Sequence, residues 1–197
     1  YMLALYMGLE KGTIDRAYYD RFIADLRAVP DKLTEFLKDT EHIERLACRL
    51  YNKEQVFFIG RGLDAAVSYE GSLKLKEISY INSFAIAAGE LKHGTIALME
   101  PGTLVIALAC QDFLYEKMVS NVQEIKARGA YVLAVAKEGN EAVGEQSDEI
   151  IYIPKIRDEI APLLSVVPLQ LFAYFVARER GCNIDKPKNL AKSVTVE

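Results

Sequence analysis

Three ionisable residues at helical spacing form the most chemically suggestive stretch of the sequence. Glu70, Lys74 and Glu77 occupy positions i, i+4 and i+7 of Glu70-Gly-Ser-Leu-Lys-Leu-Lys-Glu77, a segment with the pattern of a helix. At about 100° per residue, these side chains fall within roughly 60° of one another, whereas Lys76 points elsewhere. Two carboxylates and an ammonium on one stripe fit either a solvated ladder of ion pairs or the wall of a site that moves protons. The spacing leaves both interpretations open.

The elements that would position this helix follow from the apolar pattern. Short, continuously apolar runs separated by helical stretches are typical of parallel strands that are covered on both faces. Four such runs occur at residues 56–60, 103–109, 131–136 and 149–154, and residues 83–87 are a fifth candidate. The pattern predicts an α/β fold: a three-layer, doubly wound, mainly parallel five-stranded sheet of the flavodoxin or Rossmann type, with an N-terminal helical arm and a C-terminal tail.

Ligands of such sheets bind beyond the carboxyl ends of the strands. We therefore expect a site near the loop after Ile59 and the start of the helix that carries Glu70. Gly60-Arg-Gly62 lies in that loop, but it lacks the third glycine of a dinucleotide fingerprint and the GK[ST] of a P-loop. This short motif fits either a plain tight turn or a weak phosphate loop.

Composition narrows the classes of function. The 197 residues carry a net charge of −4, which gives no electrostatic reason to bind nucleic acid or an anionic membrane. Three cysteines far apart, without a CxxC pair, indicate neither a disulfide framework nor a zinc site. We expect no metal, no cofactor, no nucleic acid and a cytoplasmic location.

One uncharged stretch, residues 160–177, just reaches the length of a membrane-spanning helix. It contains Pro162, Ser165, Pro168 and Gln170, and the sequence has no second stretch of this kind. A helix buried in a globular core has the same composition, so we predict a core helix and no membrane contact.

Five segments in order carry a family resemblance. They are Gly60-Arg-Gly62, Glu70-Gly-Ser-Leu-Lys-Leu-Lys-Glu-Ile-Ser-Tyr80, Ala88-Gly-Glu-Leu-Lys-His-Gly94, Val167-Pro-Leu-Gln170 and Asn189-Leu-Ala-Lys-Ser-Val-Thr-Val-Glu197. Together they resemble the C-terminal sugar isomerase (SIS) region of the glutamine–fructose-6-phosphate aminotransferases, or glucosamine-6-phosphate synthases. The resemblance covers the whole chain but only the last part of those enzymes. It implies a helical connector from a preceding SIS half at residues 1–52, an SIS domain at 53–182 and an active-site tail at 183–197.

The resemblance implies a reaction that converts fructose 6-phosphate and glutamine-derived ammonia into glucosamine 6-phosphate. Glu77 matches the family's base, which moves a proton between adjacent carbons of the open-chain sugar. Lys74 matches an active-site residue that would keep a neighbouring carboxylate ionised. Glu70 is expected to orient Lys74.

Two further catalytic assignments come from the family alone. His93 matches the histidine that opens the sugar ring and that serves the active site of the neighbouring subunit, so a homodimer is implied. Lys192 matches the lysine used at the sugar's carbonyl carbon, and Ala191 is expected to supply backbone contacts to the sugar. Without the resemblance, His93 fits a hydrogen-bonded loop residue and the tail around Lys192 fits a frayed terminus.

Parts of the family's machinery are missing from this sequence. The Ser/Thr-rich loop that grips the sugar phosphate belongs to the preceding SIS half, and the glutaminase part is also absent. The loop after Ile59 offers no hydroxyl until Ser68, so we expect no phosphate cradle there. The chain by itself is therefore predicted to be inactive toward fructose 6-phosphate.

Two other hypotheses remain. The chain fits a non-catalytic SIS module that senses sugar phosphates, as in regulators that join this fold to a DNA-binding helix-turn-helix. It also fits a plain scaffold in which Glu70, Lys74 and Glu77 form a solvated ladder. A sensor needs its own phosphate loop and has no use for Glu77, His93 and Lys192 together.

Overall fold

The structure is a computed structural model that describes residues 1–189. The chain divides into two compact units, one formed by residues 1–38 and one that begins at Asp39. The boundary expected after residue 52, between a helical connector and an SIS domain, stays a prediction.

The first unit is a pair of helices, α1 (Met2–Glu10) and α2 (Arg16–Phe36). Helix α2 begins where the Asp15 carboxylate accepts the Tyr18 N–H at 2.6 Å, which satisfies one of the free amides of the first turn. Phe22 of α2 is buried. This pair agrees with the helical arm that the sequence predicts.

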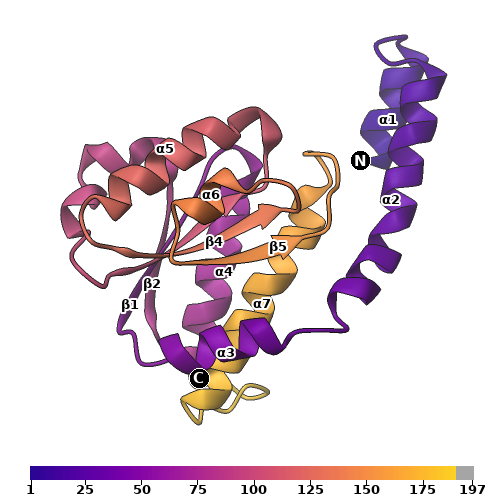
Figure 1. The fold of residues 1–197 in the computed structure, drawn as a ribbon. Coiled ribbons are helices and arrows are strands. Elements are labelled where there is room, and N and C mark those ends of the chain that lie inside the picture. Colours follow the sequence, from indigo (N-terminus) through magenta and orange to yellow (C-terminus); the bar gives the residue numbers. More distant parts are fainter. Residues whose placement is uncertain (190–197) are drawn as a thin grey trace, which may run out of the picture. The chain divides into compact units, whose positions relative to one another are not determined.

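The second unit is built on five parallel strands (Figure 1). Their spatial order is β2-β1-β3-β4-β5, and every neighbouring pair is parallel. All five predicted runs form strands, which are β1 (Gln55–Gly60), β2 (Asn82–Ala87), β3 (Leu104–Ala109), β4 (Tyr131–Lys137) and β5 (Glu149–Ile153). The predicted three-layer α/β fold is confirmed, and the sheet is entirely parallel.

Helices cover both faces of this sheet, which explains why its central strands are apolar throughout (Figure 1). One face carries α5 (Tyr115–Lys126), the short α6 (Ala142–Glu145) and the 3₁₀ segment η1 (Ala88–His93). The other face carries α4 (Leu63–Ser79) and α7 (Ala161–Glu179), with α3 (Glu41–Leu50) packed on α7. Short 3₁₀ turns complete the described unit at Thr95–Leu98 (η2) and Asp112–Leu114 (η3).

Helix α7 is the stretch that resembles a membrane span in length and composition. It packs along α4 and α3 and is mostly buried inside the unit, with Phe172 and Val176 almost fully enclosed. A helix that neighbours surround on most sides must be apolar on most sides. The structure therefore agrees with the prediction of a core helix.

Candidate functional site

Two glycines allow the strand β1 to turn directly into α4, the helix that carries the predicted acids. A Cβ on Gly60 would lie 2.5 Å from the Asp64 carbonyl carbon, so any side chain there would collide with the first turn of α4. Gly62 has φ +56°, a conformation that glycine adopts without strain. The motif Gly60-Arg-Gly62 is thus a tight strand-to-helix turn in this structure.

The stripe that the sequence predicts does form on α4. The Lys74 ammonium lies 2.7 Å from a Glu77 carboxylate oxygen and 3.6 Å from a Glu70 carboxylate oxygen. The three side chains are partly enclosed, with exposed fractions of 43% for Glu70, 33% for Lys74 and 26% for Glu77. The hydrogen bond to Glu77 raises the pKa of Lys74, so this lysine stays protonated beside Glu77.

The stripe does not lie at the carboxyl edge of the sheet, where the sequence predicts a ligand site. Helix α4 begins at that edge and runs antiparallel to the strands, so Glu77, in its last turn, lies toward the opposite edge. The rule for ligands of α/β sheets concerns loops that follow strands, and it does not reach a helix face two or more turns away.

His93 lies apart from this stripe within one chain. It is exposed at the end of η1, which directly follows β2, whereas Glu77 precedes the start of β2 by five residues. Six strand residues span roughly 17 Å, which puts the two side chains toward opposite ends of the sheet. His93 makes no hydrogen bond or ion pair within residues 1–189. One chain therefore does not bring His93 to Glu77.

Lys192 and Ala191, the predicted tail residues, lie outside the described residues. The described part of the tail is held at the end of α4. The Lys188 N–H donates to the Tyr80 hydroxyl at 2.6 Å, and the Lys188 ammonium lies 5.9 Å from the centre of the Tyr80 ring. Arg180 donates to the Ser79 carbonyl at 2.9 Å. The last described residues therefore lie beside Tyr80, which follows Glu77 by three residues in the sequence.

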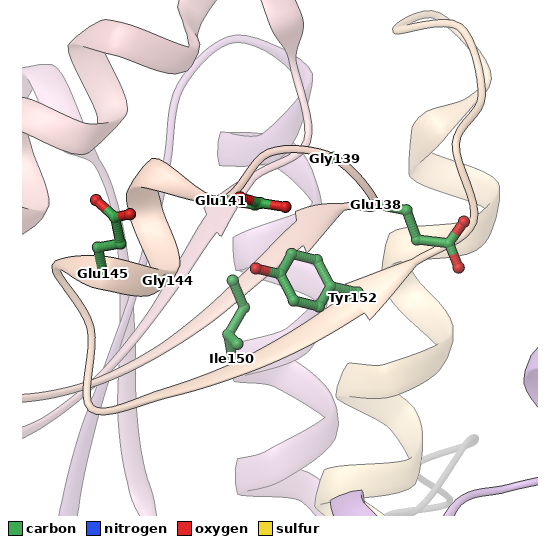
Figure 2. A pocket seen from close by; sticks show the side chains of 7 residues that line it. All are labelled: Glu138, Gly139, Glu141, Gly144, Glu145, Ile150 and Tyr152. Atoms are coloured by element: carbon green, nitrogen blue, oxygen red, sulfur yellow. The ribbon is translucent and has the colours of Figure 1, made fainter.

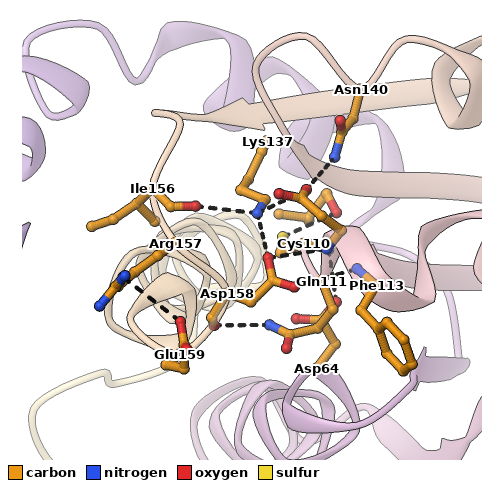
Figure 3. A network of polar contacts seen from close by, with 12 residues as sticks. Asp64, Cys110, Gln111, Phe113, Lys137, Asn140, Ile156, Arg157, Asp158 and Glu159 are labelled. Atoms are coloured by element: carbon orange, nitrogen blue, oxygen red, sulfur yellow. Dashed lines mark hydrogen bonds and ion pairs between the residues drawn. The ribbon is translucent and has the colours of Figure 1, made fainter. Parts of the chain in front are cut away.

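A polar network surrounds the buried Lys137 at the carboxyl edge of the sheet (Figure 3). Lys137, at the end of β4, is 1% exposed and donates to Asp158 at 2.6 Å and to the Ile156 carbonyl at 3.1 Å. It also lies 2.8 Å from an Asp112 carboxylate oxygen. Burial lowers the pKa of Lys137, but the hydrogen bonds to the two carboxylates outweigh burial and the pKa is raised overall.

The Asp158 carboxylate binds backbone amides in the turn that precedes α5. Its carboxylate accepts the Asp112 N–H at 3.0 Å and the Phe113 N–H at 3.3 Å, in the turn between β3 and α5. Burial raises the pKa of Asp158, but its hydrogen bonds, above all with Lys137, lower the pKa overall. Amides at a strand-to-helix turn are a common binding place for a ligand anion, and here an internal anion takes that place.

Asp64 is the other buried acid at this edge. One of its oxygens accepts the Cys110 N–H at 2.7 Å, and the other has no hydrogen-bond partner among the described residues. Burial raises the pKa of Asp64 to about 7.

A separate hollow at the β5 side is lined by acids (Figure 2). Glu138, Glu141 and Glu145 surround about 550 Å³ beside Tyr152. Three carboxylates without a cation among the lining residues disfavour a phosphorylated ligand in this hollow. Within residues 1–189, no group of three or more His, Cys, Asp or Glu side chains is arranged to hold a metal ion.

Residues 49–179 match the family model described as SIS domain. The chain belongs to the SIS domain family. Curated relatives extend the likeness beyond the SIS domain to the whole chain. The chain is 57% identical over 197 residues to a glutamine–fructose-6-phosphate aminotransferase [isomerizing] of Caldanaerobacter subterraneus subsp. tengcongensis. It is 53% identical to the enzyme of the same name from Clostridium tetani.

In both relatives the match covers all of this chain and 32% of the relative, so the chain spans about a third of their length. A solved structure of this SIS family is described as the C-terminal domain of glucosamine-fructose-6-phosphate aminotransferase from Francisella tularensis. It superposes with a TM-score of 0.86 at 32% identity, over 94% of this chain and 52% of that one. The likeness agrees with the resemblance read from the sequence.

Sequence reasoning missed three residues of this SIS unit. Lys137 carried a usable signal, since a charge directly after an apolar strand run lies at the carboxyl edge of a parallel sheet. Tyr80 and Asp158 carried none, because their roles depend on partners that are far away in the sequence.

Proposed function

We propose that this chain is the C-terminal isomerase part of a glutamine–fructose-6-phosphate aminotransferase, which makes glucosamine 6-phosphate from fructose 6-phosphate and glutamine-derived ammonia. The observation that carries the proposal is 57% identity across every residue of the chain to a relative of that name. As a cytoplasmic metabolic enzyme, the complete protein would add the glutaminase part and the first SIS half. Sugar phosphate is its small-molecule partner.

Glu77 acts as the base that removes a proton from one carbon of the open-chain sugar and returns it to the adjacent carbon. The 2.7 Å contact with Lys74 supports this role, because it fixes the position of the Glu77 carboxylate on the face of α4. Glu70, at 3.6 Å, helps to orient Lys74. The partly enclosed position of Glu77 leaves it accessible to a substrate held by another part of the protein.

Lys192 acts at the sugar's carbonyl carbon, and Ala191 contributes backbone contacts. The anchor at Tyr80 supports this role. Lys192 follows Lys188 by four residues, and a chain of four residues reaches at most roughly 14 Å. A tail held at Tyr80 therefore starts within one short segment of Glu77.

His93 serves the active site of the neighbouring subunit in a homodimer. Its separation from Glu77 by the length of β2 supports this arrangement, because ring opening and proton transfer need both groups at one sugar. The imidazole has no hydrogen-bond partner within the described chain and is exposed, so it is available to a partner subunit.

The sensor hypothesis differs from the enzyme hypothesis in the residues that would hold the sugar phosphate. A sensor needs its own phosphate cradle, and in this unit the amides of the β3–α5 turn are bonded to Asp158. That occupation argues against a phosphate cradle at the β3–α5 turn, and the catalytic phosphate grip is expected in the first SIS half. It also supports the expectation that the chain alone does not turn over fructose 6-phosphate.

The test is Glu77→Gln in the complete aminotransferase. Loss of a general base should reduce kcat by about 10²–10⁴-fold, whereas the exposed Glu54→Gln, the same change elsewhere, should leave kcat unchanged. Retained activity in the Glu77 variant would exclude the base assignment and favour the scaffold hypothesis. Turnover of fructose 6-phosphate by the 197-residue chain alone would contradict the division of the active site.

A further inference from the structure

A small hollow beside α5 has a charge pattern that the proposed function does not use. It encloses about 300 Å³, a volume near the lower end of the range for small-molecule sites. Its side chains are Arg61, Lys92, Lys117, Ser120, Asn121 and Glu124. Three cations therefore face one carboxylate.

The hollow lies at the carboxyl edge of the sheet. Arg61 belongs to the turn after β1, Lys92 to η1 after β2, and the remaining side chains to α5. The ends of β1 and β2 are in register, with Gly60 opposite Ala87. Helices α5 and α4 cover opposite faces of the sheet (Figure 1). The hollow beside α5 is therefore on the other side of the sheet from the Glu77 stripe.

Pairing within the hollow leaves two of the three cations without a carboxylate. Lys92 lies 2.8 Å from Glu124, and its hydrogen bond lowers the pKa of that acid. Arg61 donates to the Asn121 side-chain carbonyl at 2.7 Å, which is a neutral partner. Neither Arg61 nor Lys117 has an ion pair among residues 1–189. Two positive charges thus remain uncompensated.

The Arg61 guanidinium is held in place before any ligand arrives. Asn121, which fixes it, is 7% exposed, and Arg61 itself is half-buried. Gly89 leaves space for it, because a Cβ at that position would lie 3.2 Å from a terminal guanidinium nitrogen. A guanidinium with one amide contact keeps several N–H donors free, and its planar fork suits two oxygens of a phosphate.

We propose that this hollow binds the phosphate group of a phosphate monoester, as a second anion site separate from the Glu77 stripe. Such a group carries a charge of about −1.5 to −2 at pH 7, which matches the two uncompensated cations. Arg61 supplies the paired donors, Lys117 a point charge and Ser120 a hydroxyl. The turn after β1 offers no hydroxyl, as the sequence predicts, and here the hydroxyl comes from α5.

The test is a titration of the 197-residue chain with inorganic phosphate, followed by amide chemical shifts in NMR. Phosphate should shift the amides of Arg61, Gly89 and Asn121. Arg61→Gln and Lys117→Gln should each weaken its affinity by about tenfold or more, since each removes a charge-assisted contact. Arg128→Gln is the matched control, because it removes one positive charge at the end of α5 outside the hollow.

Fructose 6-phosphate should shift the same amides, and unphosphorylated fructose should not, because the phosphate is the recognised group. No shift of these amides with phosphate would overturn the proposal. So would an affinity that both variants retain, or a response to fructose equal to that of its phosphate. Shifts confined to the Glu77 helix would support the proposed function and overturn the second site.

Discussion

Asp64, which is buried at the carboxyl edge of the sheet, has a higher pKa than an ordinary aspartate. Its pKa rises from 3.8 to about 7, because desolvation outweighs the hydrogen bond from the Cys110 N–H. Between these two values the folded chain binds a proton that the unfolded chain has lost. The free energy of unfolding therefore falls as pH rises from about 4 to about 7.

Asp64→Asn should remove this dependence. An amide oxygen still accepts the Cys110 N–H, but the side chain no longer ionises. We expect the variant to be more stable than the parent by about 2–4 kcal/mol at about pH 8 and to converge with it near pH 4. Urea unfolding across this range measures the difference. Curves that stay parallel at every pH would mean that Asp64 is charged in the folded chain.

At the scale of elements, α4 is positioned by its contact with α7 and the sheet. Gly71 makes the close approach possible, because a Cβ there would lie 2.6 Å from Leu169 and 3.0 Å from Phe58. Gly71 directly follows Glu70 in α4. The packing of α4 against α7 and the sheet therefore also fixes the position of Glu70, Lys74 and Glu77. The face that packs and the face that carries the acids are thus set together.

Gly71→Ala should push α4 away from α7. Overpacking of this kind destabilises a protein by about 1–3 kcal/mol, even though alanine favours a helix more than glycine does. Denaturant unfolding measures the loss. Lys76→Ala, on the exposed side of the same helix, should change stability by less than about 0.5 kcal/mol. Equal losses of stability in the two variants would show that the close approach to Leu169 does not limit the stability of the protein.

The tail is a second element whose position depends on one side chain. Tyr80→Phe removes the hydroxyl that accepts the Lys188 N–H but keeps the aromatic ring. We expect faster tryptic cleavage after Lys188 with an unchanged midpoint of thermal unfolding, since the contact is local and exposed. In the complete enzyme the same change should lower kcat with little effect on stability. An unchanged cleavage rate would mean that the tail is held elsewhere.

At the scale of the whole molecule, the proposed function draws one active site from two subunits. Glu77 and His93 are separated by the length of β2 within one chain, and this separation supports the proposal that they come from different subunits. The amides of the β3–α5 turn are bonded to Asp158, which supports a catalytic phosphate grip in another part of the protein. The proposal therefore divides one reaction between two subunits and two SIS halves.

Mixed dimers test that division. Complete enzymes carrying Glu77→Gln or His93→Ala should each be nearly inactive. After unfolding and refolding together, random pairing gives half mixed dimers, each with one intact site, so about a quarter of the parent activity should return. Recovery is measured with the coupled assay for glucosamine 6-phosphate. No recovery, with dimers formed, would place His93 and Glu77 in the same subunit's site.

The sequence itself determined much of the fold and part of the candidate site. Continuous apolar runs predicted all five strands, because strands covered on both faces have no polar side. The i, i+4, i+7 spacing predicted the contacts of Lys74, because helical geometry fixes them locally. The ordered motifs indicated the SIS family, to which the chain belongs.

Only the tertiary structure decided which ends and faces these groups occupy. The sequence placed the ligand site at the carboxyl edge, whereas the antiparallel course of α4 carries Glu77 away from it. The bonds of Lys137 with Asp158, of Tyr80 with Lys188 and of Arg61 with Asn121 each join residues 21 to 108 positions apart. Local spacing sets contacts within a helix or strand, but such long-range pairs exist only once the layers have packed.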